Sequence, residues 1–144
     1  MKLKFFIFSL VLLASSFSVN AQKVKFKKGD VLVDGEKIFT YEKQNLGNTI
    51  SIYTLDDNTE VLYMNFDDGG TLHYHDDNFM AMNFLIENVK IETSNFNGRG
   101  FKYILGQMIK QGVISKNGEI VPEKLEIFSN KYDESITDRT IINR

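Results

Sequence analysis

The chain has 144 residues, is 42% hydrophobic and 25% charged, and contains one proline, no cysteine and no tryptophan. This content of apolar and aromatic side chains is too high for a disordered protein, and the length is short for two ordinary domains. The formal net charge of −2 is not basic enough for a nucleic-acid binder. The absence of cysteine excludes disulfides, a thiol nucleophile and any Cys-ligated zinc or iron–sulfur site.

Residues 1–21 have the pattern of a secretory signal peptide. Two lysines precede an apolar run from Phe5 to Leu13, and serines then lead to the small residue Ala21. We expect cleavage between Ala21 and Gln22, export to the periplasm or the medium, and a single mature domain over residues 22–144. The alternative is a retained membrane anchor, but the apolar run is shorter than the ~18 residues that a span needs. Bacterial lipid attachment is excluded because it requires a cysteine.

From about residue 24 to residue 94, short alternating stretches are separated by turn signals, which is typical of antiparallel strands. At Glu87-Asn88 the alternation changes phase, which indicates a hairpin or, alternatively, a bulge in one long strand. Because the connections are short, neighbouring strands should pair as a meander. The expected strands cover residues 23–27, 31–33, 37–42, 49–55, 60–66, 71–75, 79–85 and the region of 89–91.

Two helices are expected after these strands, at about 100–111 and 122–133. In the first, apolar residues recur with helical spacing, and Gly106 inside it suggests close packing against another element. Gly112 suits the left-handed position after this helix. Pro122 suits the first position of the second helix, whose apolar stripe consists of Leu125, Phe128 and Tyr132 with Ile127 beside it.

For residues 135–144 the pattern leaves a last strand and a loose tail as alternatives. The predicted fold is therefore an α+β domain, in which an antiparallel meander of six to eight strands is followed by two C-terminal helices. A twisted sheet of this size has room to curl toward a half-barrel.

The chain resembles small exported bacterial proteins of unknown function that have a signal peptide, a β-rich body and a C-terminal helical pair. The residues that carry the resemblance are Asp34-Gly35-Glu36-Lys37, Gly112-Val113-Ile114, Asn117-Gly118 and the segment from Glu123 to Tyr132. The resemblance implies export and a fold, and it assigns no site residue.

His73 and His75 are the only histidines and the candidate metal ligands. On a strand, residues i and i+2 project from the same face, so the two imidazoles would be able to share zinc or copper. Asp67, Asp68 and Asp76-Asp77 are the neighbouring carboxylates that would complete the site. The alternative is a pair of solvated histidines.

Three other features have a structural and a functional interpretation. The acidic turns 56–58, 67–70 and 76–78 favour turn chemistry over calcium, because none matches a calcium loop. The loop Asn97-Gly98-Arg99-Gly100 resembles a phosphate-binding loop but lacks its signature, which favours a connector. Lys23, Lys25 and Lys27 form a row on the first strand that either defends a sheet edge or contacts an anionic surface.

No nucleophile–base pair, cofactor motif or metalloprotease motif is present, so we expect a non-catalytic protein without a cofactor. The leading hypothesis is an exported module that binds an unknown protein or envelope component. The alternative is a carrier of a metal ion or of a small apolar ligand, for which the chain supplies the aromatic residues Phe39, Tyr41, Phe66, Phe79, Phe84 and Phe101. The oligomeric state stays open.

Overall fold

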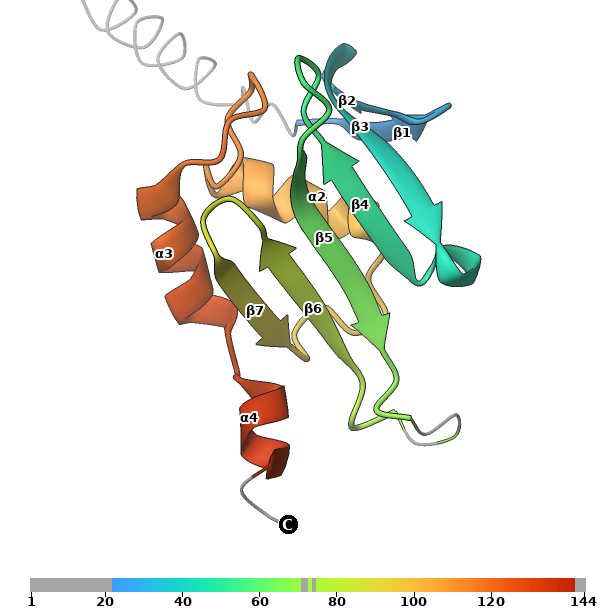
Figure 1. Ribbon diagram of the computed structural model, residues 1–144, viewed down its shortest axis with the longest axis vertical. Coiled ribbons are helices and arrows are strands. Elements are labelled where there is room, and N and C mark those ends of the chain that lie inside the picture. Colours follow the sequence, from blue (N-terminus) through green and yellow to red (C-terminus); the bar gives the residue numbers. More distant parts are fainter. Residues whose placement is uncertain (1–21, 71–72, 74, 142–144) are drawn as a thin grey trace, which may run out of the picture.

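The computed structural model describes residues 22–70, 73 and 75–141, which form an open sheet with helices on one side (Figure 1). The predicted signal peptide, residues 1–21, lies outside the described residues. The elements are β1 (Val24–Lys27), β2 (Asp30–Val33), β3 (Glu36–Gln44), a 3-10 turn η1 (Asn45–Gly47), β4 (Thr49–Tyr53), β5 (Glu60–Asp67), β6 (Phe79–Phe84), β7 (Val89–Thr93), α2 (Phe101–Lys110), α3 (Pro122–Tyr132) and α4 (Ile136–Ile141).

The seven strands pair in chain order, each antiparallel to the next, and β1 and β7 form the two edges. The predicted α+β meander with C-terminal helices is therefore confirmed. The sheet is open rather than closed into a barrel. The hairpin interpretation of Glu87-Asn88 is also confirmed, because β6 and β7 pair from Phe84↔Val89 onward and Asn88 takes a positive φ of 54°.

The strand expected at residues 71–75 falls partly on Thr71, Leu72 and Tyr74, which lie outside the described residues. At its two described positions, His73 lies in a turn and His75 in irregular backbone, and β5 pairs directly with β6. The tail, expected as a strand or a loose end, instead begins with the short helix α4.

One face of the sheet is apolar and the other is polar. Ile50, Met64, Met82 and Ile91 lie side by side across β4–β7, and all four side chains are 0% exposed. The residues next along these strands face the other way and form the row Ser51, Tyr63, Asn83 and Lys90. Strand alternation places these two sets on opposite faces, so only one face needs a cover.

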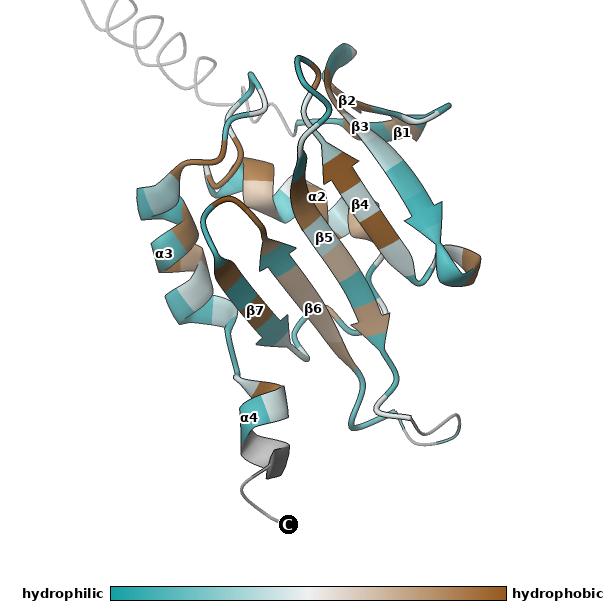
Figure 2. Cartoon of the chain, in the orientation of Figure 1, coloured by the Kyte–Doolittle hydropathy of each residue, from teal (hydrophilic) through white to brown (hydrophobic). Residues whose placement is uncertain are grey.

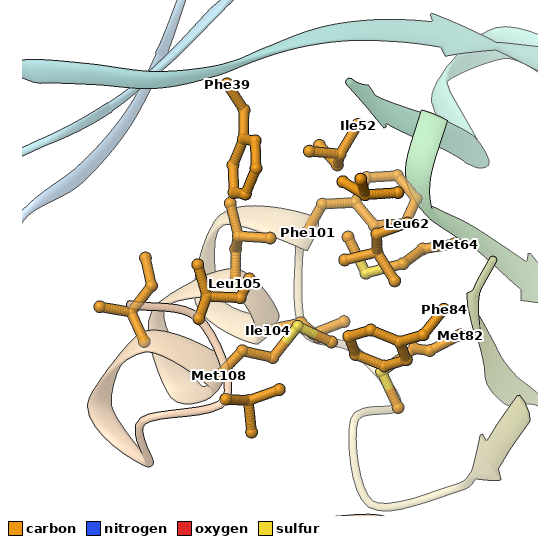
Figure 3. Packing of buried hydrophobic residues seen from close by; sticks show 14 of the residues in the cluster. Phe39, Ile52, Leu62, Met64, Met82, Phe84, Phe101, Ile104, Leu105 and Met108 are labelled. Carbon is orange, nitrogen blue, oxygen red and sulfur yellow. The ribbon is translucent and has the colours of Figure 1, made fainter. Parts of the chain in front are cut away.

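Helix α2 supplies that cover. It crosses behind the sheet in Figure 1, and brown apolar bands mark α2 and β4 in Figure 2. Figure 3 shows its side chains directed at those of the sheet. The helix residues that are buried in the shared core are Phe101, Ile104, Leu105, Met108 and Ile109, as their helical spacing predicts.

The end of α2 is fixed by a backbone motif. Gly112 has a φ of 77°, its N–H donates to the Ile109 carbonyl at 3.0 Å, and the Val113 N–H donates to the Met108 carbonyl at 2.9 Å. This pair of bonds is a Schellman motif, and Val113 and Met108 are both buried in the core. The predicted left-handed role of Gly112 is confirmed.

An aromatic cluster attaches α3 to the molecule. The ring of Phe96 lies 6.3 Å from that of Phe128, 5.0 Å from that of Tyr132 and 6.4 Å from that of Tyr103 on α2. The predicted stripe of α3 is confirmed for Leu125 and Phe128, which are buried, and for the half-buried Tyr132, whereas Ile127 is 60% exposed. Phe96 lies in a loop that shows no periodicity, so sequence patterning missed it.

The free edge of β7 is covered by Asp133, which is the C-cap of α3, and by the next residue, Glu134. The Glu92 N–H donates to Asp133 Oδ1 at 2.9 Å, and the Glu92 carbonyl accepts from the Glu134 N–H at 2.8 Å. The Glu134 carboxylate accepts from the Ser94 N–H at 2.5 Å. These groups satisfy the backbone positions at which another strand would pair.

The Glu92 side chain holds α4 against the same edge. Its carboxylate accepts from the Thr137 N–H at 2.7 Å and pairs with the Lys90 ammonium. Burial raises the pKa of Glu92, but hydrogen bonds from Lys90 and Thr137 outweigh it and hold the pKa below its ordinary value of 4.5. Burial likewise raises the pKa of Asp133, and the Glu92 and Ser135 donors outweigh it.

These lowered pKa values predict a loss of stability in acid. A carboxyl group with a lowered pKa in the folded state stabilises the fold above its unfolded pKa, and this contribution is lost as the pH falls through the folded value. We expect the free energy of unfolding to be flat near neutral pH and to fall below about pH 4.5. Asp133→Asn should make this decline shallower and cost at most ~1 kcal/mol at neutral pH. Urea unfolding over a pH series measures both, and parallel curves for the two proteins would contradict the prediction.

A second prediction concerns Gly118, in the connection between α2 and α3. Its φ is 83°, and a Cβ placed there would lie 2.8 Å from the Ile38 carbonyl oxygen. Gly98 also has a positive φ, 71°, but nothing lies within 4 Å of its would-be Cβ. Gly98→Ala should therefore cost ~1 kcal/mol from backbone strain alone, and Gly118→Ala should cost at least ~1 kcal/mol more. Chemical denaturation of both variants tests this, and equal costs would show that the Ile38 contact is unimportant.

Candidate functional site

A groove of about 950 Å³ lies between the start of β1 and the outer flank of α2. Val24 and Phe26 of β1 face the helix side of the sheet, and Val24 packs against α2 at Gly106. Most core-facing residues of α2 lie on its other flank, and Ile109 borders both the core and the groove. The groove therefore lies where the β1 edge of the sheet meets the solvent-facing flank of α2.

Four lysines line this groove. Lys102 and Lys110 come from α2, Lys116 from the connection to α3, and Lys23 from the residue before β1. The single carboxylate among the lining residues is Asp34, which accepts a hydrogen bond from the Lys23 backbone N–H at 2.9 Å. In the described part of the chain, no carboxylate lies within ion-pair distance of the four ammonium groups. The groove is thus cationic in a chain whose formal net charge is −2.

The floor of the groove is apolar. Its accessible part comes from Tyr103 and from Gly106, while the lining residues Val24 and Ile109 are buried beside them. Tyr103 is 42% exposed, and the Arg99 guanidinium lies 4.8 Å from its ring centroid, which places a further cation beside the groove. An apolar floor with a cationic rim suits a ligand that carries negative charge and an apolar part.

Gly106 is not required by packing. A Cβ added at this residue would meet only the Val24 Cγ2 within 4 Å, at 3.8 Å, which is an ordinary van der Waals contact. The sequence-based expectation of close packing is therefore correct about the neighbour, since β1 lies against Gly106, but the approach is looser than expected. Glycine costs ~1 kcal/mol relative to alanine in a helix, and here that cost has no steric reason.

The sequence points to single lysines of this groove, but it does not show that they lie together. Lys23 belongs to the row of lysines that the sequence assigns to a sheet edge or an anionic surface, and both roles remain compatible with the structure. Lys110 lies in the last turn of α2, where the negative end of the helix dipole favours a cation. The signal that was available is the spacing of Lys102, Gly106 and Lys110 at i, i+4 and i+8, which places all three on one face of α2.

The two histidines are not aligned by a strand. His73 lies in a turn and His75 in irregular backbone, and both are exposed. The His75 Nδ1 lies 3.3 Å from the Asn78 Nδ2. Among the described residues, no three His, Asp or Glu side chains are grouped as a metal site would need. Metal binding by His73 and His75 stays a prediction, without the strand geometry that motivated it.

The carboxylates of the acidic turns accept hydrogen bonds from groups of the same turns. Asp67 Oδ1 accepts from the Gly69 N–H at 2.9 Å, and Asp68 Oδ1 accepts from the Gly70 N–H at 3.0 Å. Asp57 accepts from the Thr54 hydroxyl, and this bond is the main reason that its pKa is lowered. Asp57 belongs to the β4–β5 turn and the other two to the β5–β6 connection, so the meander places them at opposite ends of the sheet.

The loop Asn97-Gly98-Arg99-Gly100 connects β7 to α2, as expected. The Arg99 N–H donates to the Phe96 carbonyl at 2.9 Å, and the Asn97 side chain donates to the Asn78 carbonyl at 2.6 Å. These bonds attach the loop to its neighbours.

The aromatic residues expected to line an apolar cavity belong to the packed core or pack against it, apart from Phe79, which is buried outside that cluster. Phe39 and Phe84 are 1% exposed, and Phe79 and Phe101 are 8% exposed. Tyr41 and Phe66 are half-buried and pack against the same cluster. These aromatic side chains therefore fill the interior of the protein and do not line a cavity for an apolar ligand.

No protein-family model, no curated protein and no solved structure matches the chain. Within residues 22–141, apart from the three undescribed positions, no helix has the length and apolar character needed to cross a bilayer.

The looseness at Gly106 gives a direct prediction. Gly106→Ala should raise the free energy of unfolding by ~0.5–1 kcal/mol, because the added methyl meets only Val24 and the helix gains conformational preference. Thermal and urea unfolding of the two proteins measure the change. A destabilised variant would show that the glycine is required by the α2–β1 contact.

Proposed function

We propose that the mature protein is an exported, non-catalytic binding module that holds an anionic component of the cell envelope in the groove between β1 and α2. The observation that carries the proposal is the set of four lysines, Lys23, Lys102, Lys110 and Lys116, around an apolar floor without an ion-paired carboxylate among the described residues. Cationic side chains gathered at one concave surface attract anions by Coulomb forces, and the effect weakens with salt.

Export is supported by the sequence of residues 1–21, whose charged start, apolar run and small residues are typical of a signal peptide. A non-catalytic role is supported by the chemistry of the lining. The groove contains lysines, glutamines and a tyrosine, and its one carboxylate is held by the Lys23 backbone. This set lacks the paired acid and base that hydrolytic chemistry uses.

The chain provides a matched control for the role of the groove. Lys25 and Lys27 are exposed on β1, and strand alternation directs them to the face away from Val24 and α2. Reversing two charges there changes the net charge by the same amount as reversing two charges in the groove. The pair of variants therefore separates a local site from general electrostatic attraction.

We predict that Lys102→Glu with Lys110→Glu abolishes most binding to isolated bacterial envelope, whereas Lys25→Glu with Lys27→Glu retains it. The precursor is expressed in an exporting bacterium, and the mature protein is recovered from the periplasm or medium with its first residue identified by mass spectrometry. Co-sedimentation with envelope fragments at low and high salt measures binding, and binding should weaken as salt rises.

Three results would contradict this proposal. Recovery of uncleaved chain inside the cell would contradict export. Equal loss of binding in both double variants would show that net charge, rather than the groove, governs attraction. Retained binding in the groove variant would place the contact on another surface.

A further inference from the structure

We infer that the occupant of the groove is a single-chain anionic amphiphile, with its alkyl chain along α2 over Gly106 and its charged head among the lysines. This inference rests on the proposed function and names the class of ligand for the same site. A small inorganic anion would need the cations alone and would leave the exposed ring of Tyr103 and the open flank of Gly106 wet. An uncharged apolar ligand would leave the four lysines without a role.

The first argument is that packing does not require a glycine at residue 106. A side chain at residue 106 would have room at its Cβ and would continue into the groove, since Gly106 is one of the lining residues. The chain forgoes helix stability there and gains open space along the middle of the floor. Natural sequences lose stability in this way where function needs the room.

The second argument is the placement of charge relative to that space. Lys102, Gly106 and Lys110 lie on one face of α2, so the two lysines stand on either side of the open floor. The rise over eight helical residues is about 12 Å, which is the length of a medium alkyl chain such as that of decanoate. The head of such a ligand would meet a lysine at an end of the groove while its chain covers the backbone of Gly106.

The third argument is the composition of the opposite wall. Val24 is buried against α2 and fixes the end of β1 beside Gly106, while Gln22 and Lys23 before it are polar. Apolar contact is thus available along the centre and polar contact at the margin. Transfer of an alkyl chain from water to such a surface is favourable in proportion to the area that it buries.

The test uses the purified mature protein and three probes in calorimetric and NMR titrations. Decanoate carries the chain and the negative charge, decyltrimethylammonium carries the same chain with a positive charge, and acetate carries the charge without the chain. We expect binding of decanoate with chemical-shift changes at α2 and β1, and affinity at least about tenfold weaker for the two other probes. Equal affinity for both long-chain probes would overturn the inference, because it would indicate nonspecific, micelle-like adsorption that does not depend on the sign of the head-group charge.

Two variants locate the chain and the head. Gly106→Leu should fill the floor and weaken decanoate binding by about tenfold or more, and the smaller side chain of Gly106→Ala should weaken it by less. Lys102→Gln with Lys110→Gln leaves the floor intact and should weaken decanoate while reducing the preference over decyltrimethylammonium. Thermal unfolding confirms that each variant is folded, and the lysine pair keeps the inference testable if the leucine variant is not.

The outcomes separate this inference from the proposed function. Envelope binding that depends on Lys102 and Lys110, together with failure of decanoate to bind, would overturn the amphiphile and leave the anionic partner in place. Binding of acetate as tight as that of decanoate would have the same meaning. Decanoate binding that is unchanged in Gly106→Leu would place the ligand outside the groove and overturn the inference.

Discussion

The packing of one helix on one face of an open sheet is the constraint on which the rest of the structure depends. The chain has no disulfide, so the apolar stripe of α2 and the rows of Ile, Leu, Met and Phe on β4–β7 must hold the domain together. The Schellman motif at Gly112 ends α2 where the sheet ends and directs the chain toward α3. The position of α2 across the sheet in turn leaves its outer flank against β1, which creates the lysine-lined groove.

An open sheet also has two edges, and this protein treats them differently. The β7 edge is covered by Asp133 and Glu134, whose backbone and carboxylates satisfy the groups of Glu92 and Ser94 that another strand would use. The β1 edge is short and carries exposed lysines, which oppose the approach of another strand by charge. The groove adjoins this edge, and Lys23, the residue before β1, lies both beside the edge and in the lining of the groove.

The sequence predicted the elements with strong local signals and missed those that depend on distant partners. Alternation located most of the strands, and helical spacing located α2 and α3 because their apolar stripes are continuous. The alternation at 71–75 is an exception, since its described positions, His73 and His75, lie in a turn and in irregular backbone while β5 and β6 pair with each other. The helix α4 was missed because a distant carboxylate, that of Glu92, holds its first turn. The role of Phe96 was missed because its ring partners lie on α2 and α3 and its own loop shows no periodicity.

The sequence by itself determined the predicted export signal, the absence of cysteine chemistry, the antiparallel meander and the two amphipathic helices, because each of these follows from local composition or periodicity. Only the tertiary structure decided which lysines meet. Lys23 and Lys116 are far apart in the chain, and the packing of α2 against Val24 brings them to one groove. The structure likewise showed that Gly106 has room beside it, since a residue's need for space depends on what another element places next to it.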